Sequence, residues 1–313
     1  MKRNLCMILA AVLVLTLGGC AWKVKLPAKA ALSPGGTAGD ASFGSGEITE
    51  KIERIELEWS SGRVELAQHG GSTVKIEERS SAELKQDERV HWRVDGTTLR
   101  IWFREPNGFD LLNFAKKELT LTLPETLRLD AMEISVASAE VRGSVNAEKL
   151  TVDSASGAVE LTTDASELEA DTASGEVRIH HSGTLEKAAF DTSSGAVTAE
   201  LGDVRYLKAD TASGDLTFRL TIAERVEIGS ASGKVCAVCD TAPDRLEVDT
   251  ASGDVELTLP KDADFRLELD TASGKFVSEI PLSIQGEHYV AGSGKADFEI
   301  GTASGDITIR SAG

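Results

Sequence analysis

Six aspartates recur at one position of a repeated Asp-Thr-Ala-Ser-Gly segment, where they could bind cations. In stacked copies their carboxylates would lie about 4.8 Å apart, so neighbouring pairs would repel by roughly 0.9 kcal/mol in water. Either each carboxylate accepts hydrogen bonds from its own turn, or together they form a cation-contacting ladder. We favour the turn, because calcium needs six to eight oxygens and the Gly-Asp nonapeptide of calcium-binding solenoids is absent. The aspartates are Asp153, Asp171, Asp191, Asp210, Asp249 and Asp270, and Gly229 and Gly301 take their place in two variant copies.

Cys236 and Cys239 form a Cys-x-x-Cys pair on a predicted strand. Redox pairs of this kind lie at the N-terminus of a helix. In an extended strand these two Cα atoms would be about 10 Å apart, beyond the roughly 7 Å that a disulfide spans, so a bridge requires a turn at Ala237-Val238. A disulfide and two free thiols both stay open, and ligands for a metal site are lacking.

Motifs for catalysis are missing elsewhere in the sequence. The five histidines show no metal-ligand spacing such as His-Glu-x-x-His, and His180-His181 falls at a loose corner where we expect both side chains to be solvated. There is no Gly-x-Ser-x-Gly elbow, phosphate-binding loop or dinucleotide fingerprint. The sequence therefore predicts no catalytic residue, no metal site and no cofactor.

A repeat of 18 to 21 residues positions these side chains. It is measured between the corner glycines from Gly157 to Gly274, and it marks a stack of units that bury their apolar faces against one another. Apolar and polar residues alternate on both sides of each glycine, as around Gly175 in residues 168–179. This period of two predicts two half-buried strands per coil, joined at a corner.

The corner itself has a chemical explanation. The Thr or Ser that ends the first strand points inward, where its hydroxyl can bond other hydroxyls or the turn's backbone. Glycine then supplies backbone freedom and the absence of a Cβ at the tightest point. We predict an all-β, single-domain β-solenoid (a β-helix) with coils of about 19–20 residues and a less regular, capped N-terminal part.

The less regular part carries six aromatic side chains, including three of the four tryptophans, whereas the regular repeats contain no tryptophan. We expect them to cap the first coil, and the alternative is an aromatic sugar-binding platform. The loop from Glu105 to Lys117 breaks the coil pattern and is where we would look for a site. The aromatic residues are Trp59, Trp92, Trp102, Phe103, Phe109 and Phe114.

The N-terminus carries an export signal. Lys2 and Arg3 precede an apolar stretch from Leu5 to Thr16 that is too short to span a bilayer, and Leu17-Gly18-Gly19-Cys20 matches a lipobox. We predict that Cys20 becomes the lipidated mature N-terminus, so that the protein is exported and held at the extracytoplasmic side of the membrane. The predicted organisation is a lipoprotein signal peptide (1–19), a lipidated flexible tether (20–46), irregular N-terminal coils with their cap (47–135) and regular solenoid repeats (136–313).

The chain is strongly acidic. Its formal net charge is −18, which becomes −20 once Lys2 and Arg3 leave with the signal peptide. An acidic surface of this size excludes nucleic acid as a partner.

Together these motifs resemble the bacterial putative-adhesin family, which includes the LiaG-type envelope proteins. The resemblance rests on the lipobox, a Ser-Gly strand start, the Leu121 to Pro124 strand end and the serial Thr-Ala-Ser-Gly corners, and it covers roughly residues 47–313. It implies a β-solenoid at the cell envelope with no established enzymatic activity.

The function that we expect is therefore a non-enzymatic, lipid-anchored envelope protein that presents a β-solenoid for adhesion or scaffolding. A carbohydrate-binding or carbohydrate-active β-helix is the alternative, and an accessory role in envelope-stress signalling follows from the resemblance alone. Membrane lipid at Cys20 and an envelope protein or polysaccharide are the expected partners, while the oligomeric state stays open. The last coil, ending at Ile309 to Gly313, lacks a cap, so we expect an open end that could pair with another edge.

Overall fold

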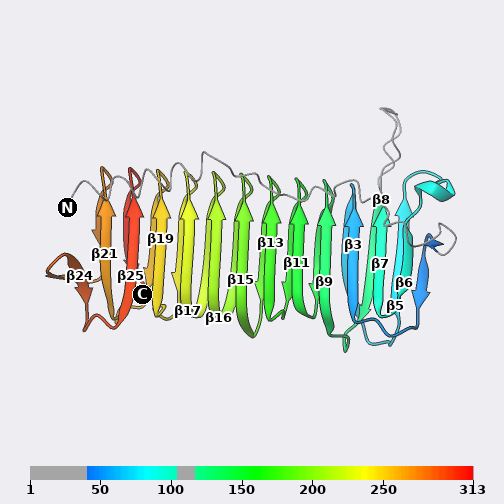
Figure 1. Ribbon diagram of the computed structural model, residues 1–313, viewed down its shortest axis with the longest axis horizontal. Coiled ribbons are helices and arrows are strands. Elements are labelled where there is room, and N and C mark those ends of the chain that lie inside the picture. Colours follow the sequence, from blue (N-terminus) through cyan, green and yellow to red (C-terminus); the bar gives the residue numbers. More distant parts are fainter. Residues whose placement is uncertain (1–40, 104–116, 313) are drawn as a thin grey trace.

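The computed structural model describes residues 41–103 and 117–312, which form a long rod of stacked two-strand coils (Figure 1). The described residues contain 26 strands and one short 3₁₀ helix, η1 (Gln86–Glu88). The predicted all-β solenoid is confirmed.

Two parallel sheets run the length of the rod, and each coil gives one strand to each sheet. In spatial order the first sheet consists of β7 (Thr98–Phe103), β3 (Arg54–Trp59), β9 (Leu129–Val136), β11 (Ala147–Ser154), β13 (Glu167–Thr172), β15 (Thr184–Thr192), the second halves of β16 (Val197–Thr211) and β17 (Leu216–Ser230), β19 (Arg245–Thr250), β25 (Ala296–Thr302) and β21 (Phe265–Thr271). The second sheet consists of β8 (Lys117–Pro124), β4 (Arg63–His69), β10 (Glu140–Val145), β12 (Val159–Thr163), β14 (Val177–His181), the first halves of β16 and β17, β18 (Val235–Cys239), β20 (Val255–Leu259), β26 (Ile307–Ser311) and β22 (Phe276–Ser278).

The alternation in the sequence produces the core. In β13, Leu168 and Ala170 are buried and Glu169 between them is exposed. The parallel register then places the buried residues of successive coils side by side, so that Leu168 lies beside Ala188 of the next coil. Because every coil repeats this pairing, one continuous apolar core runs between the two sheets.

The spatial order of the coils differs from their order in the chain at both ends. Strand β25 lies between β19 and β21, and β3 lies between β7 and β9 (Figure 1). The expectation that the last coil forms an open end is therefore wrong, because β25 and β26 are enclosed by neighbours on both sides. All coils carry the same pattern, so the pattern alone does not determine which coils are neighbours.

A column of glycines determines how closely the coils stack. A Cβ on Gly214 would lie 2.0 Å from the carbonyl oxygen of Gly195, and one on Gly274 would lie 1.8 Å from that of Gly305. None of the corner glycines from Gly157 to Gly274 has a positive φ. These positions therefore require glycine for the missing Cβ and not for an unusual backbone conformation.

Ser and Thr hydroxyls close the regular corners, as the sequence predicted. Thr192 is fully buried and its Oγ1 donates to Gly195 O at 2.8 Å, and Thr250 Oγ1 accepts from Gly253 N at 2.7 Å. The inward polar side chain is thus satisfied by its own turn, which removes the cost of burying it.

Antiparallel strands cover three of the four sheet ends. At the N-terminal end, β6 (His91–Asp95) pairs with β7, and β5 (Val74–Ser80) pairs with β8; β1 (Ser42–Phe43) and β2 (Gly46–Ile48) extend these two edges. At the C-terminal end, β24 (His288–Ala291) pairs with β21, and β23 (Ser283–Gln285) pairs with β24. Among the described residues, no strand pairs with the outer edge of β22.

The glycine column gives a first prediction. We expect Gly214→Ala to lower the free energy of unfolding by roughly 3 kcal/mol, because its Cβ would overlap a backbone oxygen that cannot rotate away. Gly70→Ala is the matched control, since no atom lies within 4 Å of its Cβ position. Urea denaturation of both variants measures the difference, and equal stability of the two would show that the column does not limit the stacking.

Candidate functional site

The predicted aspartate ladder exists on the outer face of the first sheet, with a different order of members. Asp153, Asp171, Asp191 and Asp210 are consecutive and in register. Beyond Asp210 the order is Gly229, Asp249, Gly301 and Asp270, so every second coil carries a glycine. The expected contact between Asp249 and Asp270 is absent because Gly301 lies between them.

The glycines give the neighbouring carboxylates room. A Cβ on Gly229 would lie 2.4 Å from Asp210 Oδ1, and one on Gly301 would lie 2.6 Å from Asp249 Oδ1. Each of these two carboxylates thus leans over a glycine of the next coil. The alternation keeps unit charges two coils apart in this half of the rod, which weakens their repulsion.

In the uninterrupted half the carboxylates perturb one another. Burial, together with the charges of Asp191, Asp153 and Glu169, raises the pKa of Asp171 to about 7. Its Oδ1 is buried and has no hydrogen-bond partner among the described residues. Burial and the charge of Asp210 also raise the pKa of Asp191.

Hydroxyl groups make the hydrogen bonds of the corner turns that we expected the aspartates to make. Thr172 Oγ1, for example, accepts from Gly175 N at 2.9 Å. A second set of aspartates, directly after the corner glycine, joins one coil to the next. Asp215 Oδ1 accepts from Lys234 N at 2.9 Å and Asp306 Oδ1 accepts from Lys275 N at 2.8 Å. The Gly-Asp dipeptide was the sequence signal for this link, and our sequence analysis missed it.

The cation-contacting role of the ladder stays a prediction. Within residues 41–103 and 117–312, no group of three or more His, Cys, Asp or Glu side chains has the geometry to hold a metal ion. A single file of carboxylates on a flat sheet presents its oxygens side by side and does not surround an ion.

The structure has Cys236 and Cys239 as free thiols. They lie on an unbroken strand, β18, with Cys236 half-buried on the outer face and Cys239 buried in the core. The turn that a disulfide would need at Ala237-Val238 is absent. Burial raises the pKa of the Cys239 thiol to about 12 and also raises that of Cys236, so neither forms a reactive thiolate readily.

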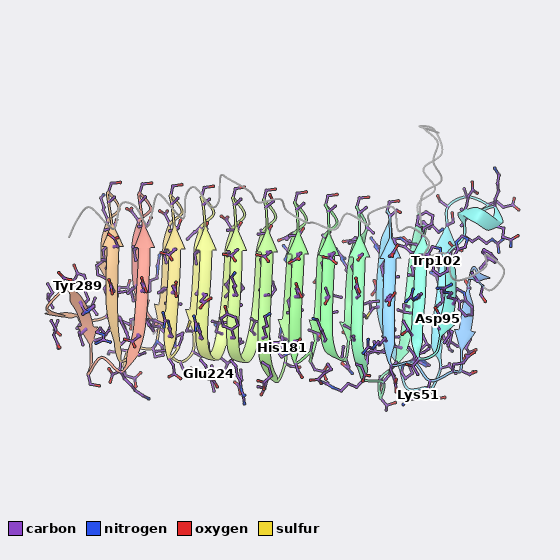
Figure 2. The ribbon with its side chains drawn as sticks, viewed as in Figure 1. Lys51, Asp95, Trp102, His181, Glu224 and Tyr289 are labelled. Carbon is purple, nitrogen blue, oxygen red and sulfur yellow. The ribbon has the colours of Figure 1, made fainter. Side chains whose placement is uncertain are left out.

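The two neighbouring histidines have different surroundings, which corrects the expectation that both are solvated. His180 is exposed, and its Nδ1 lies 3.1 Å from Glu200 Oε2. His181 is 3% exposed, and its Nε2 donates to Ala165 O at 2.7 Å. Burial lowers the pKa of His181, as expected for a neutral ring that fills the core at the looser corner, where Figure 2 labels it.

A buried lysine lies beside the aromatic residues at the N-terminal end. Lys117 Nζ is 2.8 Å from Glu78 Oε1, and these side chains are 3% and 6% exposed. The ammonium lies 3.4 Å from the ring centroid of Phe103 and 5.4 Å from that of Trp59, and it also donates to Glu88 O. Burial lowers the pKa of Lys117. The sequence did not indicate this ion pair, because Lys117 lies on β8 and Glu78 on β5, and these strands become neighbours only in the fold.

The remaining aromatic residues divide between core and surface. Trp59 and Phe103 are buried, whereas Trp92 and Trp102 are half-buried. Trp102 stacks on His91 with 5.6 Å between ring centroids, and Trp92 Nε1 donates to Gly44 O at 3.0 Å. Phe109, Phe114 and the loop from Glu105 to residue 116 lie outside the described residues, as do Cys20 and the predicted signal and tether up to residue 40.

Open depressions on the described surface include two with volumes of about 310–320 Å³. Phe43, Gln86 and Arg89 line the first. The second lies over β19, β25 and β21, where Arg245 and Arg266 alternate with Asp297. The described residues of the two linings include no Ser, Cys or Lys nucleophile. Among the described residues, no helix is long and apolar enough to cross a membrane.

This geometry defines a class of protein, a capped β-solenoid with charged outer faces and no enclosed cleft lined by catalytic groups in its described part. The chain belongs to the Toastrack DUF4097 family, whose model matches residues 52–310. The predicted putative-adhesin resemblance is thereby confirmed at the level of the family, while the LiaG-like assignment stays a prediction. No curated protein matches the chain.

The chain also matches several solved bacterial proteins over most of its length. A putative adhesin from Parabacteroides distasonis ATCC 8503 is 14% identical, with 86% of this chain and 98% of that chain covered and a TM-score of 0.47. A putative adhesin from Bacteroides fragilis NCTC 9343 is also 14% identical, with 86% and 97% covered and a TM-score of 0.45. A putative lipid binding protein from P. distasonis is 13% identical, with 87% and 97% covered and a TM-score of 0.37.

The ladder gives a prediction about pH. Burial raises the pKa of folded Asp171 to about 7, whereas an unfolded aspartate loses its proton near pH 4, so the contribution of Asp171 to stability should fall as the pH rises between these values. We expect Asp171→Asn to flatten this slope and to raise the melting temperature at pH 8. Thermal melts from pH 4 to pH 8 measure both effects.

Asp264→Asn is the control, for which we expect the opposite change in stability. Asp264 Oδ1 accepts from the backbone of Ser293, Gly294 and Lys295, and these bonds lower its pKa. Removing the carboxylate of Asp264 should reduce stability at neutral pH. If Asp171→Asn also lowered the melting temperature at pH 8, the ladder would not carry the proposed repulsion.

The buried ion pair gives a third prediction. Lys117→Met should cost about 3–5 kcal/mol, because it leaves the Glu78 carboxylate buried without its partner. Adding Glu78→Gln should recover part of this loss. Arg219→Met, which breaks an exposed pair with Asp240, should cost less than about 1 kcal/mol. Chemical denaturation compares the four proteins, and a double variant no more stable than Lys117→Met would contradict the explanation.

Proposed function

We propose that this protein is a non-enzymatic, lipid-anchored component of the bacterial cell envelope that presents a β-solenoid for adhesion or scaffolding. The observation that carries the proposal is the surface of the rod, which is a regular array of charged side chains on rigid strands. Successive coils add the same strand at the same spacing, so an extended partner can contact many equivalent positions.

Ion pairs between coils support this role. Arg219 of one coil pairs with Asp240 of the next at 2.9 Å, and Lys234 pairs with Glu256 at 2.7 Å. Such pairs at exposed positions contribute little stability each. They orient the side chains along the rod, and with the net charge of −18 they favour cationic or mixed-charge partners.

The lipid anchor rests on the sequence. Cys20 follows the small residues of a lipobox, and a spacer rich in Gly, Ser and Pro separates it from the solenoid. A spacer of this kind would hold an acidic body away from an anionic membrane. The names of the similar structures, putative adhesins and a putative lipid binding protein, agree with a role outside catalysis.

Labelling of the full chain in bacteria with an alkyne fatty acid tests the anchor. We expect the wild-type protein to carry the label and to sediment with membranes, and we expect Cys20→Ser to lose both properties. Cys236→Ser is the matched control and should keep both. Label on the Cys20→Ser protein would overturn the anchor.

Affinity capture from an envelope fraction tests the second half of the proposal, with the detergent-solubilised full chain as bait. Enrichment of a membrane protein or a cell-wall polymer without chemical change supports adhesion or scaffolding. Cleavage of a retained polysaccharide would instead establish the carbohydrate-active alternative and direct attention to Trp102 and the N-terminal end.

A further inference from the structure

The C-terminal end of the rod has one strand edge without a partner. Strand β22 pairs with β26 on one side, and no described residue pairs with its other side. The edge of the first sheet at the same end is covered by β24 and β23. Figure 2 labels Tyr289 of β24 at this end, where its ring lies 5.1 Å from that of Phe276.

The backbone of β22 shows which groups face outward along the sheet. Lys275 O accepts from Ile307 N at 2.8 Å, and Glu279 N donates to Ile309 O at 2.8 Å. Backbone groups alternate in direction along a strand, so the N–H and C=O groups of Phe276 and Ser278 point to the open edge. This edge therefore offers two donors and two acceptors to an added strand.

The same end carries exposed apolar side chains. Val277 of β22 is 55% exposed and Ile284 of β23 is 73% exposed. In the described part of the chain, only Ile222 is a further large apolar residue with such exposure. A monomer that keeps an apolar edge strand uncovered is prone to pair with another chain.

The charges around Val277 select the partner. Lys275 lies two residues before Val277 and Glu279 two residues after it, all three are exposed, and the alternation of the strand places them on one face. If a second β22 pairs antiparallel about Val277, each Lys275 lies opposite a Glu279 of the other copy. The segment is thus complementary to itself, with two pairs of opposite charge across the strands.

We propose that β22 pairs with β22 of a second copy of this chain about a two-fold axis at Val277. Phe276 of each copy exchanges both backbone hydrogen bonds with Ser278 of the other, which gives four bonds in total. The two Val277 side chains form the central non-hydrogen-bonded pair. The result is a closed dimer, because the interface uses the same surface on both copies.

The capping hairpin fits this arrangement. Strand β24 pairs with the first half of β21, at Phe265 to Leu267, and leaves the second half uncovered. The two-fold axis reverses the strand direction, so the hairpins of the two copies lie at opposite ends of the interface and do not meet each other.

Cysteine cross-linking tests the proposal on the full chain in its membranes, in a Cys236→Ser background. The paired Cβ atoms of residue 277 would be about 4.5–5.5 Å apart, so Val277→Cys should form a disulfide-linked dimer under mild oxidation. Thr308→Cys is the matched control, because residue 308 lies on β26 beside Val277. Its two copies would be about 14 Å apart, which prevents a bridge.

A charge exchange provides the second arm. Adding Lys275→Glu to the Val277→Cys protein should lower the yield of dimer about tenfold, since each interface would hold two like-charged pairs. Adding Glu279→Lys as well should restore the yield. A Val277→Cys protein that cross-links no more than Thr308→Cys would overturn the proposal, and so would equal yields from the single and double charge variants.

Other outcomes also decide the question. Sedimentation of the detergent-solubilised wild-type chain should show a dimer that dissociates on dilution, whereas a ladder of larger species would mean head-to-tail growth and would overturn the two-fold model. The proposal does not depend on the lipid anchor. A Cys20→Ser protein that still cross-links through Val277→Cys would separate a failure of anchoring from a failure of pairing.

Discussion

The stacking distance at the Ser-Gly corner is the constraint on which the rest of the structure depends. The carbonyl oxygen of one corner glycine occupies the place that a Cβ on the next glycine would need, 2.0 Å away in the case of Gly214 and Gly195. A side chain at any of these positions would force the coils apart there. Because the same coils are joined by backbone hydrogen bonds in both sheets, a separation at the corner would break the register along each strand.

This close stacking also explains the electrostatics of the outer face. It places equivalent residues of successive coils directly above one another. A side chain that is favourable in one coil is then favourable in every coil, whereas a charged side chain lies next to like charges. Buried hydroxyls benefit, since each Thr bonds its own turn and needs nothing from its neighbours. Carboxylates do not benefit: burial, together with the charges of neighbouring carboxylates, raises the pKa of Asp171 to about 7. Glycines at Gly229 and Gly301 interrupt the column where the repulsion would otherwise continue.

A stack of equivalent coils has no intrinsic end, and the two ends of this rod are closed in different ways. At the N-terminal end, antiparallel strands extend both sheets, and the buried pair of Lys117 and Glu78 joins β8 to β5. At the C-terminal end, a hairpin closes one sheet, and the chain then returns to insert its last coil between two earlier ones. The strand left at the edge, β22, is short, which is a usual way to limit unwanted pairing. It nevertheless exposes Val277 between a lysine and a glutamate, which is the basis for the proposed dimer.

The sequence by itself determined the solenoid, the two strands per coil, the inward hydroxyls and the aspartate position, because each follows from a local period of two and a corner that recurs every 18 to 21 residues. The order of the coils was decided only in the tertiary structure. Any coil with this pattern could stack on any other. The local sequence therefore does not show that Gly301 lies between Asp249 and Asp270, or that β3 lies between β7 and β9. The burial of His181 and the contact between Lys117 and Glu78 were beyond the sequence for a related reason. Each depends on strands that meet only after the chain has folded back on itself, and a side chain's environment is set by what packs against it.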